Sequence, residues 1–296
     1  MNIPKLIKPF LYFVRNKCRS FVNRKNIPIL TYILLFRIES LILRKGSLDI
    51  FNKDTYFKIV ERQRNSDLSW SFPSSNKRRG WLYSAGLLYR GKDLANTYEI
   101  NKIRLDEGDI IIDCGANFGD FWLYLKALDI QLTYFGVEPG HEEFKVLERN
   151  LKFNTSKISS NCIEKALSDK TCRSIFHYSP DGADSSLIKP KNHSSTYEVS
   201  CITLDDLLLD FKLTDKKIKL LKLEAEGFEP EIIEGARSSL PNIQYIAADL
   251  GPERGINEDN TIAEVTNILL KNGFSIDNCH LLYKRATLIF RNNNFN

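Results

Sequence analysis

The chain has 296 residues, of which 43% are hydrophobic and 27% are charged. This composition excludes a disordered or fibrous protein, and the length allows one large α/β domain with extensions. The cysteines are scattered and form no Cys-x-x-Cys pair; they lie at positions 18, 114, 162, 172, 201 and 279. Neither a metal site nor a disulfide framework is therefore expected, and free thiols indicate a reducing, cytoplasmic compartment.

The net charge of +5 is unevenly distributed along the chain. Residues 1–45 contain ten Lys or Arg and a single acid, Glu39, which gives +9 and leaves about −4 for the rest. A nucleic-acid-binding domain would carry its basic patch on the binding surface itself. Because the positive charge lies on an arm instead, nucleic acid is not an expected partner.

Residues 1–61 are predicted to form a basic, amphipathic, helical N-terminal extension. Apolar residues recur at helical spacing between Leu6 and Phe21, with basic residues among them. A second apolar run at 29–36 is too short to span a bilayer, which takes ~20 apolar residues. Two interpretations stay open: a helical cap packed on the domain, or an anchor on an anionic membrane surface such as the inner membrane face.

Residues 62–92 are predicted to be a connector and an aromatic-rich lead-in to the main domain. Their aromatic residues are Trp70, Phe72, Trp81, Tyr83 and Tyr89. Such side chains either pack on a neighbouring core or line a sugar-binding cleft.

Strands and helices alternate from residue 93 to residue 296. The predicted helices are 93–105, 118–128, 141–152 and 260–271, and the predicted strands are 109–113, 133–138, 161–165, 219–224, 243–249, 273–277 and 285–291. This order predicts an α/β fold with a doubly wound, mostly parallel, Rossmann-like sheet. Such sheets bind ligands at the carboxyl ends of their strands.

The interval 168–203 breaks this alternation. It is rich in Ser, Lys and Asp, and we expect a hairpin or a mobile flap. It also contains His177 and His193, which could act as bases if the segment folds over the site. Thr203 is predicted to begin a helix, with Asp205 and Asp206 in its first turn.

The most informative motif follows the predicted strand 109–113. Asp113 ends that strand, and Gly115 and Gly119 let the backbone turn sharply beside a ligand. The next strand ends in a second acid, Glu138, which suits ribose hydroxyls. A pyrophosphate fits poorly, because Asn117 carries a side chain where a dinucleotide motif has glycine and because Asp113 would repel phosphate. A cationic nucleoside such as S-adenosylmethionine fits better.

Six motifs in one consistent order resemble the FkbM family of S-adenosylmethionine-dependent methyltransferases. They are Gly108 to Gly119, Glu138-Pro139, Leu147 with Asn150 and Asn154, Ala166 to Asp169, Thr203 to Leu207, and Leu221 to Glu229. The resemblance covers roughly residues 95–290 and implies a class I methyltransferase sheet with an antiparallel strand near the C-terminus. One position departs from the family pattern, because Glu224 stands where the family usually has Asp.

The resemblance implies methyl transfer to a hydroxyl oxygen of a small-molecule or carbohydrate acceptor, in surface-glycan or natural-product biosynthesis. The candidate catalytic bases are Glu224, Glu226 and Asp249. The expected cofactor-binding residues are Asp113, Gly115, Ala116, Asn117, Gly119, Glu138, Pro139, Ala166 and Leu167. Two alternatives remain: a nucleotide-dependent oxidoreductase on the same fold, and a non-catalytic cofactor-binding module.

Overall fold

A computed structural model describes residues 27–43, 48–62, 67–179 and 185–295 of the chain. The chain divides into two compact units, one comprising residues 1–90 with 152–154 and the other residues 91–151 with 155–296. The amphipathic pattern between Leu6 and Phe21 lies outside the described residues. Within the described residues, no helix is both long and apolar enough to cross a bilayer.

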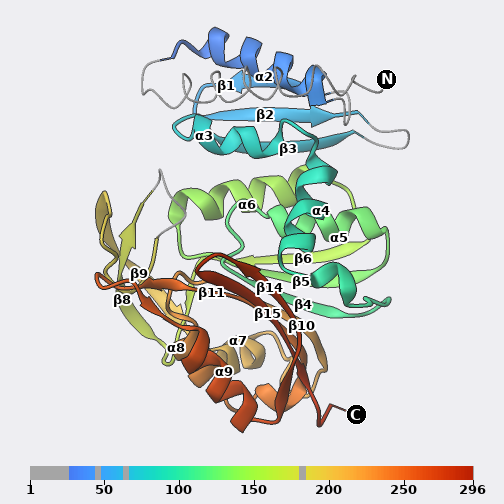
Figure 1. The fold of residues 1–296 in the computed structure, drawn as a ribbon. Coiled ribbons are helices and arrows are strands. Elements are labelled where there is room, and N and C mark those ends of the chain that lie inside the picture. The colour runs from blue at the N-terminus through green and yellow to red at the C-terminus, as the bar shows by residue number, and fades with distance from the viewer. Residues whose placement is uncertain (1–26, 44–47, 63–66, 180–184, 296) are drawn as a thin grey trace. The chain divides into compact units, whose positions relative to one another are not determined.

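The first unit combines helices with a small antiparallel sheet (Figure 1). Its elements are α2 (Ile29–Leu43), β1 (Leu48–Lys53), β2 (Tyr56–Glu61), β3 (Leu68–Pro73), α3 (Lys77–Gly80) and the start of α4 (Leu87–Thr97). Residues 48–61 are therefore a hairpin, although we expected the extension to be helical throughout. The reason is a period of two: Ile50, Phe57 and Ile59 alternate with more exposed residues and are buried.

The aromatic residues of the lead-in form the core of this first unit. Trp70, Phe72, Trp81 and Tyr83 are all buried, whereas Tyr89 is exposed. Tyr32 of α2 packs among them, with its ring centroid 4.9 Å from that of Phe57 and 5.5 Å from that of Trp81. These contacts assign the buried aromatic side chains to packing.

The second unit is built on a seven-stranded sheet with the order β14-β15-β11-β10-β4-β5-β6. Its strands are β4 (Ile110–Cys114), β5 (Leu132–Val137), β6 (Ile158–Ile163), β10 (Ile218–Leu223), β11 (Ile243–Leu250), β14 (Phe274–Leu282) and β15 (Arg285–Asn292). The ladders from β6 to β11 are parallel, and β15 is antiparallel to both neighbours. The predicted doubly wound, mostly parallel α/β sheet of class I methyltransferase type is confirmed.

Helices cover both faces of this sheet (Figure 1). The helices are α5 (Asp120–Leu128) and α6 (His141–Phe153) on one face, and α7 (Leu204–Asp210), α8 (Glu229–Glu234) and α9 (Ile262–Lys271) on the other. Ile112, Cys114, Leu221 and Leu223 face the second set of helices in one large core. Because side chains alternate along a strand, Asp113 and Lys222 project from the opposite face.

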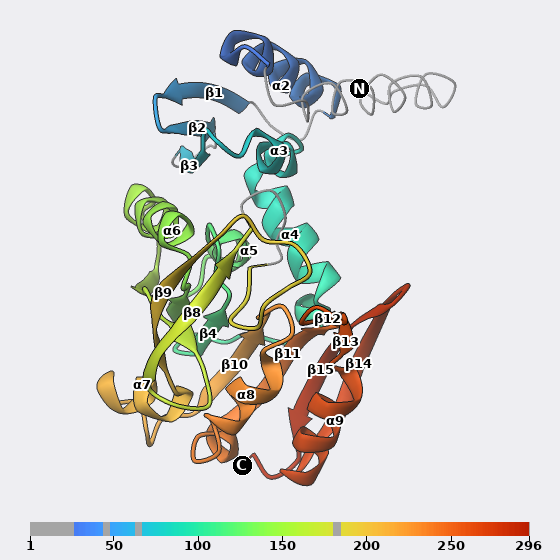
Figure 2. The ribbon, with the colours of Figure 1, turned by 90° about the vertical axis from the view of Figure 1, so that its left-hand side faces the viewer.

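The interval 168–203 forms a hairpin over most of its length. β8 (Cys172–Tyr178) and β9 (Ser195–Ile202) pair antiparallel, and the short β7 (Ala166–Leu167) pairs with β9. Figure 2 shows these strands in front of the central sheet. The predicted helix start is also confirmed, since the Thr203 hydroxyl accepts a hydrogen bond from the Asp206 backbone N–H at 2.9 Å.

The helix expected at 93–105 differs from the structure. α4 ends at Thr97, and a short 3₁₀ turn, Ile100–Lys102, follows it. Glu99 between them has φ of 58°, a left-handed conformation that cannot continue a right-handed helix.

Candidate active site

The glycine turn after β4 is tied to its neighbouring strand and to the end of β10. The backbone N–H groups of Gly115 and Ala116 both donate to the carbonyl of Val137, at 3.0 and 3.1 Å. Gly115 has φ of 73°, and a Cβ atom there would lie 2.1 Å from the Glu224 carbonyl oxygen. Only glycine fits this position, because the two backbones are in direct contact.

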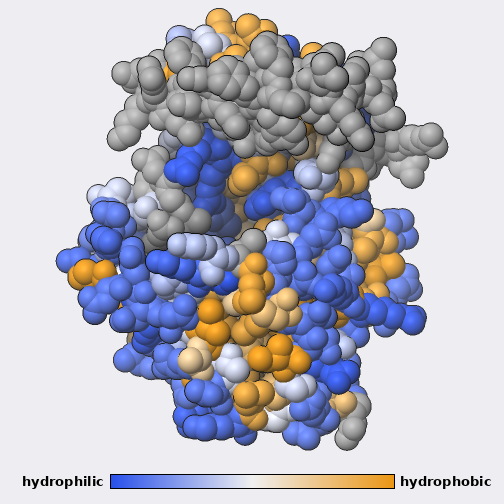
Figure 3. All heavy atoms as spheres, in the orientation of Figure 1, coloured by the Kyte–Doolittle hydropathy of each residue, from blue (hydrophilic) through white to orange (hydrophobic). Residues whose placement is uncertain are grey.

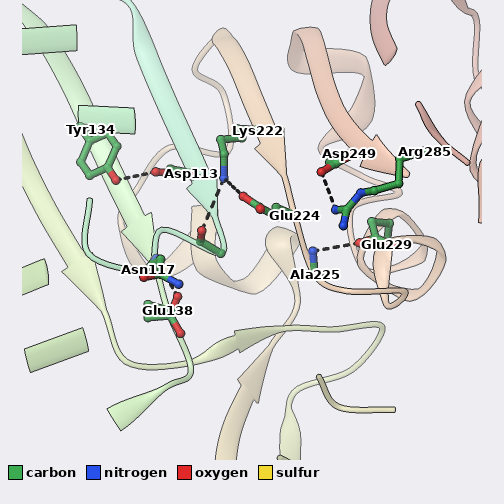
Figure 4. A network of polar contacts seen from close by, with 11 residues as sticks. Asp113, Asn117, Tyr134, Glu138, Lys222, Glu224, Ala225, Glu229, Asp249 and Arg285 are labelled. Atoms are coloured by element: carbon green, nitrogen blue, oxygen red, sulfur yellow. Dashed lines mark hydrogen bonds and ion pairs between the residues drawn. The ribbon is translucent and has the colours of Figure 1, made fainter. Parts of the chain in front are cut away.

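Glu138 lies at the end of β5 and is hydrogen-bonded into the same turn. It is 6% exposed, and its carboxylate accepts hydrogen bonds from the N–H groups of Asn117 and Gly140, both at 2.8 Å (Figure 4). Pro139 follows it directly and cannot extend the strand's hydrogen bonding. The structure thus brings three of the predicted residues, Gly115, Asn117 and Glu138, together at the carboxyl ends of β4 and β5.

Lys222 joins the turn to β10 from inside the protein. Its side chain is 2% exposed, and its ammonium lies 3.0 Å from Asp113 Oδ1 and 2.9 Å from Glu224 Oε2 (Figure 4). It also donates to the Gly115 carbonyl at 3.4 Å and lies 5.2 Å from the centroid of the Tyr98 ring. The parallel register places Lys222 directly beside Asp113, so the ion pair follows from the ladder itself.

Asp113 is therefore neutralised within the protein. It is fully buried, and the Tyr134 hydroxyl donates to its second oxygen at 2.7 Å. Burial raises the pKa of Asp113, although Lys222 and Tyr134 both act to lower it. The carboxylate that the sequence suggested for a cationic ligand is held instead by a cation of its own.

Glu224 is the more exposed partner of Lys222, with 30% of its side chain exposed. Burial acts to raise its pKa, but the Lys222 ammonium, the Tyr98 hydroxyl and Arg285 together outweigh that effect and lower the pKa to about 2. The pair therefore stabilises the fold above the ordinary carboxyl pKa of 4.5, and this contribution is lost as the pH falls towards 2. A carboxylate with so low a pKa is a weak base.

Asp249 ends β11 and is also paired. The Arg285 guanidinium donates to Asp249 Oδ2 at 2.6 Å and contacts Glu253 with its other nitrogen. Burial raises the pKa of Asp249 and brings that of Glu253 to about 7, while Arg285 opposes both shifts. One guanidinium thus serves two carboxyl groups.

Glu226 differs from the other two candidate bases. It is 8% exposed, and its side chain makes no hydrogen bond or ion pair with any residue that the structure describes. Burial raises the pKa of Glu226 well above its ordinary value, and the nearby Glu253 and Glu224 raise it further. Both effects favour the protonated form, and a carboxyl group with a raised pKa is a stronger base once it is ionised.

The backbone at Glu226 is held in a rare conformation. Its φ is 50°, and Gly227 follows with φ of 93°. The Glu229 carboxylate accepts from the N–H groups of Ala225 and Gly227, at 2.9 and 3.2 Å, and Arg254 donates to the Gly227 carbonyl at 2.6 Å. Left-handed backbone at a residue other than glycine persists only where its surroundings enforce it, which these contacts do.

The remaining predicted residues lie on the hairpin side of the site. Ala166 and Leu167 form β7, and both side chains are buried. His177 and His193 pack edge to face with 5.0 Å between their ring centroids, and burial lowers the pKa of His177. This contact explains the placement of the histidines without a ligand.

The geometry fits the nucleoside expected from the sequence. Backbone N–H groups hold the Glu138 carboxylate beside the glycine turn. A carboxylate in that place can accept hydrogen bonds from the hydroxyl groups of a ribose. The residues that sequence reasoning missed are Lys222, Glu253 and Arg285. Lys222 had a signal, because it is a charged residue in the Leu-rich strand 218–223, whereas Arg285 is 36 residues away from Asp249 in the chain and had none.

We expect Lys222→Met to lower the free energy of unfolding by about 3–5 kcal/mol, because it leaves two carboxylates without their counter-charge. The loss should be smaller at about pH 5 than at about pH 8, since buried carboxylates escape the penalty by taking up protons. Urea unfolding at the two pH values measures both effects, with the exposed Lys216→Met as control. An equal loss at both values would contradict a charge-based role.

Residues 113–276, more than half of the chain, match the model of the methyltransferase FkbM domain family. The chain is 26% identical over 179 residues to methyltransferase sdnD of Sordaria araneosa, covering 51% of this chain and 68% of that protein. It is 23% identical over 223 residues to 31-O-demethyl-FK506 methyltransferase FkbM of Streptomyces tacrolimicus, covering 65% and 82%.

Solved structures show a more distant likeness. One is magnesium protoporphyrin IX methyltransferase from Synechocystis PCC 6803 with bound S-adenosylmethionine, with 12% identity, a TM-score of 0.39, and coverage of 69% of this chain and 78% of that one. The family match spans the turn, Glu138 and the carboxyl ends of β10 and β11. The chain therefore belongs to the FkbM methyltransferase family, and its methyl donor is S-adenosylmethionine.

Proposed function

We propose that the protein transfers the methyl group to a hydroxyl oxygen of a small-molecule or carbohydrate acceptor. The observation that carries this proposal is Glu226, a buried carboxyl group without a partner among the described residues, on the turn that follows β10. A carboxylate there can take the proton of a hydroxyl group. The FkbM relative is named for an O-demethyl compound, which supports oxygen as the acceptor atom.

We assign the donor-binding site to the glycine turn and Glu138. Glu138 would accept hydrogen bonds from the ribose hydroxyls. The backbone of Gly115, Ala116, Asn117 and Gly119 would line the nucleoside, with Pro139, Ala166 and Leu167 beyond them. Asp113 would act indirectly, by holding Lys222. When bound, S-adenosylmethionine supplies a methyl group on a sulfonium centre that an oxygen attacks in line.

The protein's own part in the reaction is positioning and proton transfer. The acceptor oxygen forms the new O–C bond, the C–S bond breaks with its electron pair on sulfur, and the hydroxyl proton passes to Glu226. Alignment of the reacting atoms can contribute about 7–11 kcal/mol and a base about 10²–10⁴-fold. Of the three candidate bases, we favour Glu226, since Glu224 and Asp249 are each held by a cation.

Family membership leaves the oxidoreductase alternative without support, and the non-catalytic alternative is decided by turnover. We expect methyl-labelled donor and a hydroxylated acceptor to give S-adenosylhomocysteine together with an alkali-stable methyl ether, detected by NMR. Glu226→Gln should slow this transfer by about 10²-fold or more while leaving donor affinity unchanged. An alkali-labile ester or an N-methyl product would contradict transfer to a hydroxyl group.

Glu138→Gln should weaken the binding of S-adenosylhomocysteine by about 10–100-fold, because the amide loses a charged acceptor for the ribose hydroxyls. Titration calorimetry measures the effect. Glu142→Gln, an exposed acid four residues further on, is the matched control and should bind like the wild type. If both variants bind equally well, Glu138 does not hold the donor.

We also propose that the N-terminal arm contacts an anionic membrane surface. α2 buries Tyr32 and Phe36 in the first unit, while Leu30, Leu34 and Leu41 are 80%, 58% and 72% exposed on its outer side. Figure 3 shows apolar atoms at this helix, at the upper margin. An exposed apolar stripe within a segment of net charge +9 is the pattern of a surface-bound helix.

The full chain should therefore sediment with vesicles of anionic lipid at low salt and much less with neutral vesicles. Replacing Leu30, Leu34 and Leu41 with Gln should release most of it, whereas Leu281→Gln, at an equally exposed apolar site on β14, should not. A wild-type chain that stays in the supernatant with anionic vesicles would rule the membrane contact out.

A further inference from the structure

A hollow lies beside Glu226 at the carboxyl ends of β10 and β11, in the second unit. It has a volume of about 180 Å³ and is lined by Pro190, Lys191, Asn192, Glu226, Pro252, Glu253, Gly255 and Glu258. This volume is below the about 300–1,000 Å³ of most small-molecule sites and suits one sugar-sized ring better than an extended ligand.

The walls of the hollow are tied to the turn that carries Glu226. The Ser186 hydroxyl lies 3.5 Å from the Ala225 carbonyl, and Lys191 pairs with Glu258 at 3.6 Å across the hollow. A Cβ atom on Gly255, where φ is 72°, would lie 3.3 Å from Ile188, so this loop and the segment at 186–192 pack closely. The hollow is thus a packed feature of the second unit.

The charges around the hollow do not balance. Lys191 and Glu258 neutralise each other, and Arg285 is shared between Asp249 and Glu253. With Glu226 counted, Asp249, Glu253, Glu226 and Arg285 sum to −2 when the acids are ionised. Buried carboxylates in excess of their cations are costly, so the hollow lacks positive charge.

We propose that this hollow is the acceptor site and that it selects a hydroxylated amine, with the acceptor's ammonium group paired to Glu253 and its hydroxyl group facing Glu226. This inference rests on the proposed methyltransferase function. An ammonium group supplies the missing cation and keeps both carboxylates ionised, while phosphorylated or carboxylated acceptors are repelled. The protonated amine is not a nucleophile, so the neighbouring hydroxyl oxygen is the atom that reacts.

The test compares matched ligands in the presence of saturating S-adenosylhomocysteine at neutral pH. The probes are D-glucosamine and D-galactosamine, their N-acetyl forms, which keep the ring but lose the charge, and D-glucose 6-phosphate. We expect the amines to bind about tenfold or more tightly than their N-acetyl forms by calorimetry or ligand-observed NMR, and the phosphate not to bind.

Variants locate the binding. Glu226→Gln and Glu253→Gln should each weaken amine binding about tenfold. Glu107→Gln should not, because Glu107 precedes β4 and so lies at the amino ends of the strands, away from the hollow. Failure of S-adenosylhomocysteine to bind would count against the proposed function. If it binds and the amines do not surpass their N-acetyl forms, or if Glu226→Gln binds amines like the wild type, the inference is wrong.

Discussion

The site depends on the ion pairs of the buried Lys222 ammonium group. This group lies between Asp113 at the end of β4 and Glu224 just after β10, and it reaches the carbonyl of Gly115 in the turn. Without it, Asp113 would be a buried carboxylate with no counter-charge, which costs several kcal/mol, and the partly exposed Glu224 would lose its partner. The ion pair holds the carboxyl ends of these two central strands together, where we propose that the ligands bind.

Neighbouring pairs of strands in the sheet carry different functional groups at their carboxyl ends. β4 and β5 carry the turn and Glu138, which suit a nucleoside, while β10 and β11 lead into Glu226, Asp249 and the loop with Glu253. Glu138 is held by backbone N–H groups, Asp249 by Arg285, and Glu226 by neither. In the proposed mechanism, Glu226 is therefore the carboxyl group that acts on the acceptor.

Much of this could be predicted from the sequence, because the signals were local. Glu138 ends an apolar strand, Gly115 and Gly119 lie within five residues directly after another, and the alternation of elements from residue 93 onwards indicated the sheet. The pairing of Lys222 with Asp113 depends on register between strands more than 100 residues apart in the chain, and Arg285 comes from the last strand. The hairpin at 48–61 was missed because the helical pattern of the preceding residues was extended to residue 61, although the apolar residues of 48–61 alternate.

The contact at Gly115 has a mechanical consequence. The two backbones are in contact there, and a Cβ atom on Gly115 would lie only 2.1 Å from the Glu224 carbonyl oxygen. The glycine turn and the turn that carries Glu226 therefore cannot slide past each other. In the proposed mechanism, this contact fixes the span between the methyl carbon and the attacking atom when the chain folds. The loops at 186–192 and 252–258 lie outside this contact, so substitutions there can reshape the hollow while the two turns keep their places.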